Sequence, residues 1–566
     1  MIKEIKNNLK EQLEKYYKDN FNLAVEFVVE EPKKAELGDI SIPVFALIKP
    51  LGKKLPEITA EVCEVIKGFD LPVENISAVG GFVNMFISRE KIAKIVLAKC
   101  IEDGLDYGKS NVGEGKNITL YYSSPNIAKS FSIGHLRSTM IGNSLKKIYD
   151  KCGYSTYGIN YLGDWGTQFG KMIVAYKTWG DKEKILADPI NELTALYVKF
   201  HKEAVDHPEL EDKAREAFRK MELRDPEYLE LWEKIRELSL KESEQIYKIL
   251  EVKFDSYRGE AFYNDKMDSV VEELESKGLL VEDNGAQIVK LGDDMPPALI
   301  KRSDGGSLYI TRDIAAVLYR KKMLNFSKIL YVVGNEQKLH FEQLKSVVKK
   351  MGYDFADDII HVNFGLYLTN GKKASTREGN VVKLYDVIKY ANSLALNQIN
   401  EKNPNLKNKE EIAEKVAVGA IIFNDLKNFR GLDVEFDLEK SIKFEGQTGP
   451  YLQYTGVRIN SILKDKTFDN KNIDLSLFTK NHYFELVRLI DDFENVIIEA
   501  AEEYSPSVIA RYLLNLATAF NKLYSLEKMN IDDEVIRNTN FTLLAATKNV
   551  LEEGLRLLGI KYLEEM

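Results

Sequence analysis

The chain has 566 residues, with 79 Lys and Arg against 88 Asp and Glu and a formal net charge of −9. This length predicts about three or four domains, and the negative balance argues against a protein that coats nucleic acid by bulk charge, while it leaves room for a local basic groove. Cys63, Cys100 and Cys152 form no close pair in the sequence, which excludes a disulfide framework and a Cys-rich zinc site and indicates a reducing compartment.

Residues 1–110 predict a small α+β domain. Ile5, Leu9 and Leu13 lie four apart among charged residues, which is the pattern of an amphipathic helix and not of a secretory signal. Two short apolar segments follow, separated by Gly and Pro turns. Loop composition near residues 104–115 marks the end of this domain.

Residues 117–390 predict an α/β domain. Strand candidates alternate with helical patterns, which implies a parallel sheet with crossover helices. The candidate strands are Ile118–Tyr122, Thr156–Leu162, Ile329–Val333 and Ile359–Leu368. Between about residues 181 and 250 the strands give way to a charged, Leu-spaced stretch, which predicts a helical insertion in this domain.

Residues 391–566 are almost wholly helical in pattern and predict an all-α bundle, with a core module at about residues 445–566. The fold class expected is therefore multidomain: an N-terminal α+β domain, an α/β Rossmann-like domain with a helical insertion, and a C-terminal all-α bundle. The longest apolar run, Val416–Phe423, is well short of the roughly 20 residues that span a bilayer. We expect a soluble, cytoplasmic protein that does not bind membranes.

The stretch from Leu120 to Ser144, LYYSSPNIAKSFSIGHLRSTMIGNS, joins an apolar strand to a helix that begins near Gly134 and His135. Free backbone N–H groups and the helix dipole favour a phosphate at such a helix start, and the imidazole adds a donor. An ordinary strand-to-helix turn fits the pattern alone equally well.

The segment SIGH, from Ser132 to His135, with the preceding SSPNIAK, resembles the first ("HIGH") signature of class I aminoacyl-tRNA synthetases, and in particular that of the arginyl-tRNA synthetase family. The resemblance implies that Ser132, Gly134 and His135 bind ATP and that Ser132 and His135 are catalytic. Ser132 replaces the first His of the usual signature. The loss of one phosphate donor costs roughly 2.7 to 4 kcal/mol of transition-state stabilisation if nothing compensates.

The loop NGKKASTREGN resembles the second ("KMSKS") signature of the family, at Lys373 to Arg377. A basic, Gly-containing loop can close over a triphosphate and neutralise the departing pyrophosphate. The resemblance implies catalytic roles for Lys373, Ser375 and Arg377, with Lys373 also on ATP. Thr376 stands where the second Lys usually falls, and in the family a Lys before the first signature compensates, which here is Lys129.

The resemblance also implies an arginine pocket. Its residues would be Ser124, Asn126, Glu260, Tyr309, Asp313 and Gln337. Tyr309 and Asp313 are four residues apart, which places them on one helix face. A planar guanidinium is best bound by carboxylates in fork geometry beside an aromatic face, so this set suits arginine better than lysine.

Two further segments are matched to the family. Phe364, Gly365 and Leu366 lie where related enzymes pack the adenine of ATP, and Asp164 and Trp165 are expected to shape the cleft without a catalytic role. His340 is expected either to line the cleft or to be structural.

Two regions are matched to tRNA-binding parts of the family. Residues 444–463 resemble the entry to its helical anticodon-binding domain, and residues 1–110 resemble the domain that contacts the outer corner of tRNA. The residues expected to contact tRNA are Tyr451, Gln453, Tyr454 and Arg458, which offer stacking and phosphate contacts. Core aromatics at helical spacing are the alternative for the two tyrosines.

The activity implied is that of an arginine–tRNA ligase that forms arginyl-adenylate from ATP and transfers arginine to the 2′-hydroxyl of the terminal adenosine of tRNA(Arg). ATP enters with Mg²⁺, no tightly bound cofactor is expected, no metal-ligand set is readable, and the chain is expected to be a monomer. A cysteinyl ligase is disfavoured because its zinc site needs a Cys and His cluster. A catalytically impaired paralogue that binds tRNA or arginine as a regulator stays open because of Ser132 and Thr376.

Overall fold

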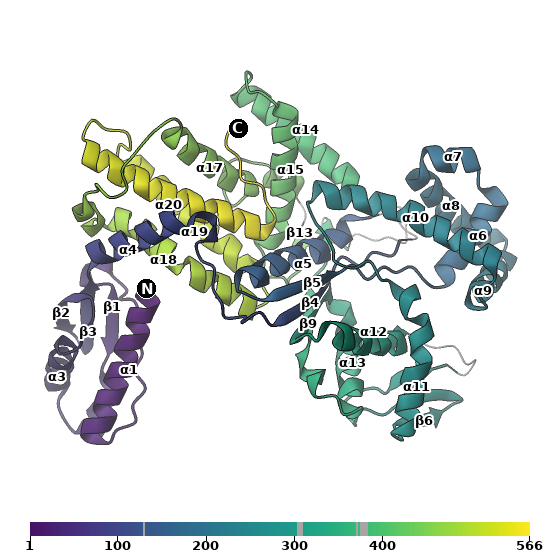
Figure 1. The fold of residues 1–566 in the computed structure, drawn as a ribbon, viewed down its shortest axis with the longest axis horizontal. Helices are drawn as coiled ribbons and strands as arrows, with labels where there is room; N and C mark the ends of the chain where they lie inside the picture. Colours follow the sequence, from purple (N-terminus) through teal and green to yellow (C-terminus); the bar gives the residue numbers. More distant parts are fainter. Residues whose placement is uncertain (128–130, 303–308, 370–371, 374–382, 436) are drawn as a thin grey trace.

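The computed structural model describes residues 1–127, 131–302, 309–369, 372–373, 383–435 and 437–566. A parallel sheet lies at the centre, the N-terminal residues and a helical insertion lie at opposite ends, and C-terminal helices pack along one side (Figure 1). This arrangement confirms the multidomain fold class expected from the sequence.

The N-terminal part packs helices on a small antiparallel sheet with strand order β1-β3-β2. Its elements are α1 (Ile2–Phe21), β1 (Ile40–Pro43), α2 (Ile48–Leu51), α3 (Leu55–Lys67), β2 (Val73–Val79) and β3 (Phe82–Ile87). The apolar face predicted for α1 is real, because Ile5, Leu9 and Leu13 are all buried. The helix after the sheet, α4 (Arg89–Asp103), packs mainly against the C-terminal helices. For example, Asn549 Nδ2 of the last helix donates a hydrogen bond to the Cys100 carbonyl of α4 at 3.1 Å.

The central sheet is parallel, with strand order β10-β9-β4-β5. Its strands are β4 (Asn117–Tyr121), β5 (Ser155–Ile159), β9 (Lys328–Gly334) and β10 (Ile359–Phe364), and its crossover helices include α5 (Ile133–Lys151), α12 (Tyr309–Leu324) and α13 (Lys338–Lys350). From β4 the chain moves to β5 on one side, then returns to β9 on the other side of β4. Such a reversal creates a crevice at the carboxyl ends of β4 and β9, where α/β proteins bind ligands.

A long segment of the chain is inserted between β5 and β9. Most of it is helical, and these helices share a core around Phe169, Phe200 and Ile235, which confirms the predicted insertion. They are α6 (Thr167–Trp179), α7 (Lys182–Ala187), α8 (Pro189–Asp206), α9 (Glu209–Glu222) and α10 (Pro226–Ile249). After α11 (Met267–Ser276) comes an antiparallel sheet of β6 (Leu280–Asp283), β7 (Ala286–Val289) and β8 (Ala298–Lys301), which the sequence analysis did not predict.

The C-terminal part is helical, as predicted. Its helices are α14 (Leu384–Lys402), α15 (Lys409–Leu426), α16 (Leu438–Ser441), α17 (Gly449–Leu463), α18 (Asn481–Glu502), α19 (Ser507–Leu526) and α20 (Glu534–Leu558). Two of them support α5 directly, since Tyr149 Oη donates to the Ala501 carbonyl and Ser144 Oγ donates to the Leu557 carbonyl, each at 2.8 Å. The helix that begins at the first signature, α5, is therefore packed against the C-terminal helices and hydrogen-bonded to two of them.

Two predicted strands differ from those observed. The strand expected over Ile359–Leu368 breaks at Gly365, where a Cβ would lie 2.3 Å from the Leu432 carbonyl oxygen, and the chain resumes as β11 (Tyr367–Thr369). β11 joins β12 (Lys372–Lys373) and β13 (Val434–Glu435) in a separate sheet. The strand expected over Thr156–Leu162 ends at Ile159, because residues 160–163 form backbone contacts with residues 125–126 and 256 instead.

Candidate active site

The loop after β4 lies in the crevice and is tightly constrained. Ser123 and Ser124 both have positive φ angles, 66° and 49°. Residues other than Gly seldom adopt this backbone conformation, and it often marks a functional site. Ser124 N donates to Asn160 Oδ1 at 3.2 Å, and the backbone of Asn126 forms a parallel bridge with Gly163. The loop is therefore fixed to the segment that follows β5, and Ser124 and Asn126 both lie at the carboxyl edge of the sheet.

His135 lies in the first turn of α5, and Ser132 precedes that helix as its N-cap. Ser132 N donates to His135 Nδ1 at 3.0 Å, and Ser132 Oγ lies 3.2 Å from the same nitrogen. Because a backbone N–H can only donate, Nδ1 is the acceptor, and the ring proton of the neutral imidazole is on Nε2. Ser132 thus fixes the orientation and tautomer of His135.

The first signature contacts the segment that follows the second signature loop through the backbone. Leu384 N donates to the Phe131 carbonyl at 3.1 Å, and Ser132 forms an antiparallel bridge with Lys383. Lys383 is the first described residue after the second signature loop, and Lys373, in β12, is the last one before it. The end of that loop at Lys383 is therefore anchored beside the first signature. Lys129, Ser375 and Arg377 lie outside the described residues, as does the side chain of Lys373.

Arg137, which the sequence analysis missed, fixes the segment proposed to hold adenine. Its side chain is 1% exposed, and its Nε lies 2.8 Å from Asp425 Oδ1. Its Nη1 donates at 2.8 Å to both the Gly365 and Leu432 carbonyls. Leu366 N also donates to Asp433 Oδ1 at 2.7 Å. Phe364, Gly365 and Leu366 are thus tied both to α5 and to the segment before β13.

Two carboxylates, Asp313 and Glu260, lie close enough beside the crevice to interact electrostatically. Asp313, in the first turns of α12, accepts a hydrogen bond from His340 Nε2 at 2.7 Å. Glu260 Oε2 lies 3.3 Å from Arg312 Nη1. Both carboxylates are largely buried, with side-chain exposures of 20% and 16%. Tyr309 begins α12, but its side chain lies outside the described part, and Gln337 is exposed at the end of the short helix after β9.

Burial controls the protonation of this pair. It raises the pKa of Glu260 to about 8 even though Arg312 opposes the shift, and the negative charges of Asp313 and Asp164 raise it further. Burial lowers the pKa of His340, but the hydrogen bond and charge of Asp313 outweigh it, so the pKa ends above its usual value. The Glu260 carboxyl is therefore mostly protonated at neutral pH, and it lies beside the Asp313 side chain that is bonded to His340.

Asp164 explains how Glu260 is held in place. Its carboxylate is 2% exposed, accepts from Ala261 N at 2.9 Å and pairs with Arg236 Nε at 3.0 Å. Glu260 N donates to the Leu162 carbonyl at 3.0 Å, and a Cβ at Gly259 would lie 2.5 Å from the Asp164 carboxylate. Asp164 is thus a support for the Glu260 segment, which is consistent with the cleft-shaping role expected from the sequence.

A buried cation lies among aromatic rings near this pocket. Arg320 is 2% exposed, and its guanidinium carbon lies 5.0 to 5.9 Å from four tyrosine rings. These are Tyr121, Tyr161, Tyr263 and Tyr331. Its Nη1 donates to Tyr331 Oη at 3.3 Å. Seven residues separate Arg320 from Asp313, so both lie on one face of α12. No local pattern in the sequence marks this cation, because the rings come from distant segments.

The residues predicted to contact tRNA divide into two groups. Arg458 lies over the ring of Tyr454, 5.1 Å away, and over that of Tyr524, 5.2 Å away, and both rings are exposed. Tyr451 accepts a hydrogen bond from Asn521 Nδ2 at 2.9 Å. Gln453 is fully buried and donates to the Lys415 and Lys561 carbonyls, so its observed contacts are structural.

Within the described ranges, no group of three or more His, Cys, Asp or Glu side chains is arranged to hold a metal ion. A search of the same ranges for a helix long and apolar enough to cross a membrane found none.

We expect His135→Ala to lower kcat for phosphate displacement by about 10²- to 10³-fold, because it removes the Nε2–H donor at the start of α5. Ser132→Ala should lower kcat by less than about tenfold, since the backbone N–H that orients the imidazole remains. Single-turnover kinetics on both variants would measure these effects. Equal losses for the two would contradict the orientation inferred for His135.

Three family models cover most of the chain. The model described as "tRNA synthetases class I (R), catalytic domain" matches residues 97–438. "Arginyl tRNA synthetase N terminal domain" matches residues 3–87, and "DALR anticodon binding domain" matches residues 452–566.

Full-length relatives agree with these models. The arginine–tRNA ligase of Enterococcus faecalis is 49% identical, with 96% of each chain covered. That of Streptococcus agalactiae is 48% identical over 99% of this chain and 100% of the relative. Among solved structures, arginyl-tRNA synthetase from Thermus thermophilus has a TM-score of 0.81 at 25% identity and covers 99% of this chain and 100% of that one. The Plasmodium falciparum arginyl-tRNA synthetase has a TM-score of 0.81 at 26% identity and covers 99% of each chain.

Proposed function

The chain belongs to the arginyl-tRNA synthetase family, and from this premise we propose how its residues carry out the reaction. Its function is ATP-dependent attachment of arginine to tRNA. In the first step the carboxylate of arginine attacks the α-phosphorus of ATP, and the bond to pyrophosphate breaks. In the second, the 2′-hydroxyl of the terminal adenosine of tRNA(Arg) attacks the arginyl carbonyl, and AMP leaves with the bonding electron pair.

Positioning and charge stabilisation are proposed to carry the first step. His135 would donate its Nε2–H to a phosphate oxygen at the start of α5, aided by the dipole of that helix and by the backbone of Gly134. Phe364, Gly365 and Leu366 would pack the adenine. The second signature loop, with Lys373, Ser375 and Arg377, and the nearby Lys129 would neutralise the departing pyrophosphate. Mg²⁺ usually binds through substrate phosphates, so we propose that it enters on ATP.

Two carboxylates are proposed to recognise the guanidinium of arginine. Asp313 and Glu260 lie close together, and a guanidinium presents fixed donors that two carboxylates can accept at once. Tyr309 would supply an aromatic face. Ser124, Asn126 and Gln337 would hold the α-amino and carboxylate ends. The single observation that supports this proposal is that the first signature, Lys383 after the second signature loop and the carboxylate pair all contact segments that follow the carboxyl ends of the parallel strands.

Exposed residues at the C-terminal helices are proposed to contact tRNA. Tyr454 and Arg458, with the neighbouring Tyr524, offer stacking surfaces and one positive charge for an unpaired RNA loop. Tyr451 lies beside them, whereas Gln453 would support this surface from within.

We further propose that the protein is a cytoplasmic monomer with domains at residues 1–110, 117–390 and 391–566.

The impaired paralogue considered from the sequence rested partly on Ser132. Since Ser132 orients His135 and caps α5, its presence is compatible with an active site. The test is ATP–pyrophosphate exchange and tRNA charging by the purified protein with arginine, lysine or cysteine, with and without tRNA. Charging of tRNA(Arg) with arginine alone is expected. No turnover with arginine and its tRNA would contradict the proposal.

Arginine binding is expected to depend on pH through Glu260, whose pKa burial raises to about 8. The charged groups around it are Arg312, Asp313 and Asp164. A protonated carboxyl must lose its proton before it can pair with a guanidinium, so KM for arginine should rise about tenfold per pH unit below that pKa and level off above it. Steady-state kinetics between about pH 6 and 9 would show this rise. Glu260→Gln should have a higher KM with little dependence on pH, and a pH-independent KM in the unaltered protein would contradict the role of Glu260.

A further inference from the structure

Arg89 joins the N-terminal part of the chain to α18. It is the first residue of α4, where the helix dipole disfavours a cation by roughly 0.3–1 kcal/mol. A bidentate ion pair with Asp39 offsets this unfavourable interaction. Arg89 Nη2 lies 2.7 Å from Asp39 Oδ1, and Arg89 Nε lies 3.3 Å from Asp39 Oδ2. Both side chains are largely buried, at 12% and 13% exposure. Asp39 Oδ2 also accepts from Ile87 N at 3.2 Å, which connects the pair to β3.

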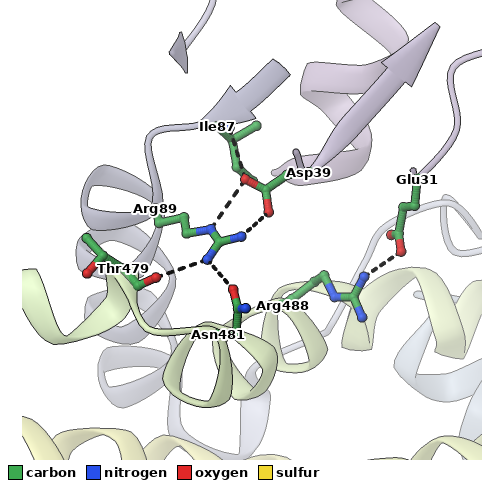
Figure 2. Close-up of polar contacts among 7 residues, drawn as sticks. All are labelled: Glu31, Asp39, Ile87, Arg89, Thr479, Asn481 and Arg488. Atoms are coloured by element: carbon green, nitrogen blue, oxygen red, sulfur yellow. Dashed lines mark hydrogen bonds and ion pairs between the residues drawn. The ribbon is translucent and has the colours of Figure 1, made fainter. Parts of the chain in front are cut away.

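The remaining Arg89 contacts cross to the helical part (Figure 2). Arg89 Nη1 donates to the Thr479 carbonyl at 3.1 Å and to Asn481 Oδ1 at 2.8 Å. The guanidinium also lies 4.9 Å from the ring of Phe484. The Arg89 guanidinium therefore connects two parts of the chain. Its Nε and Nη2 bind Asp39 in the N-terminal part, and its Nη1 binds residues at the start of α18.

Further contacts follow the same face of α18. Arg488 pairs with Glu31, and Asp491 Oδ2 accepts from Ile2 N at 2.8 Å. Asn481, Phe484, Arg488 and Asp491 are spaced three, four and three residues apart, which forms one stripe along the helix. We call the contacts that Arg89, Glu31 and Ile2 make with this stripe the α18 latch.

The N-terminal part carries a basic face next to the latch. Lys3, Lys6 and Lys10 are spaced three and four residues apart on α1 and line a groove with residues 26–29, where Glu26 pairs with Lys10 at 3.2 Å. Glu31 accepts from Lys6 at 3.3 Å as well as from Arg488, so this face and the latch share a residue. Lysines in a row suit contacts with RNA phosphates.

We propose that the α18 latch is a positioning device for tRNA, which holds the basic face of α1 at a fixed distance from the RNA-contacting surface of the C-terminal helices. This inference rests on the proposed function, because it takes tRNA as the shared ligand. When one RNA contacts two surfaces, the second contact is intramolecular, and its effective concentration depends on how well the surfaces are spaced. Domain interfaces of moderate size otherwise allow relative motion. Arg89 and Asp39 are thus positioning residues that do not themselves touch the reacting groups.

Two variants test the latch in complementary ways. Arg89→Met removes the connection together with a positive charge. Asp39→Asn breaks the pair while it makes the protein less negative, a change that by long-range electrostatics favours RNA binding. Weaker tRNA binding by Asp39→Asn cannot therefore come from a lost phosphate contact. Asp70→Asn, at an exposed position of the same part of the chain, makes the same charge change and is the matched control.

Binding of two RNAs should be measured by fluorescence anisotropy: full-length tRNA(Arg) and its isolated anticodon stem-loop. We expect Arg89→Met and Asp39→Asn to raise the Kd for full-length tRNA by about tenfold or more, and to leave the Kd for the stem-loop within about twofold of that of the unaltered protein. KM for arginine should be unchanged at saturating tRNA, and Asp70→Asn should bind both RNAs normally.

The proposal would be overturned if both variants bound full-length tRNA as tightly as the control, or if the stem-loop were weakened as much as the full tRNA. The second result would show a change within the helical part itself. Failure of the proposed function is distinguishable, because it would appear in the unaltered protein as an absence of arginine charging.

Discussion

Asp313→Asn is expected to lower kcat/KM for arginine by about 30-fold to several thousand-fold, since truncation of one partner of a buried, hydrogen-bonded charge pair costs about 2–5 kcal/mol. Asp313 is expected to carry most of this recognition, because Glu260 beside it is mostly protonated at neutral pH. An amide of the same shape would present an N–H₂ group to a ligand that has donors and no acceptor on its guanidinium. The loss should therefore fall on arginine.

Three measurements on this variant separate recognition from folding. Direct binding of arginine by calorimetry should be lost or strongly weakened, whereas the Kd for tRNA and the midpoint of thermal unfolding should remain close to those of the unaltered protein. Asp268→Asn, an exposed carboxylate on α11, is the matched control and should bind arginine normally. Unchanged arginine affinity in Asp313→Asn would show that the guanidinium is bound elsewhere.

Arg137→Met is expected to destabilise the protein by about 3–5 kcal/mol, because it leaves Asp425 as an uncompensated buried charge. Arg137 and Asp425 have side-chain exposures of 1% and 0%, and the three carbonyls that Arg137 contacts would also lose a donor. Chemical denaturation with a probe of the sheet region would measure the change.

The double variant Arg137→Met/Asp425→Leu provides the control for this prediction. Replacing both buried charges by apolar groups is often neutral or stabilising, so the double variant should recover most of the lost stability. It should not recover full activity, because the segment from Phe364 to Leu366 would still lack the Arg137 contacts that fix it. A stable Arg137→Met protein would contradict the structural role given to this pair.

Much of the site could be expected from local sequence. The start of α5 near His135 follows from a strand, a loop and an apolar helical face in succession, whereas Asp313 was singled out by the family resemblance alone. Each of these signals is contained within about 20 residues, which is the range over which hydrophobic period and capping residues are informative.

The contacts that hold the site together could not be expected in the same way. Arg137 binds carbonyls at residues 365, 430 and 432, and Asp164 supports the segment around residue 260. Their partners are far away in the sequence and carry no local pattern. The break of the expected strand at Gly365 has the same origin, because the close approach comes from the distant residue Leu432.

The contact between Ser132 and His135 could also not be predicted from the sequence. As a replacement for a histidine it suggested a weakened phosphate site. Its backbone N–H, and not its hydroxyl, makes the contact that fixes the imidazole tautomer. A backbone donor is available from any residue except proline, so a serine at this position keeps the contact that orients His135.

The most direct test is a crystal structure of the protein with a non-hydrolysable arginyl-adenylate analogue. We predict that the guanidinium lies within hydrogen-bond distance of the carboxylates of both Asp313 and Glu260, and that the phosphate-mimicking group accepts a hydrogen bond from His135 Nε2. An analogue whose guanidinium contacts neither carboxylate, or whose phosphate mimic lies away from the start of α5, would contradict the site described above.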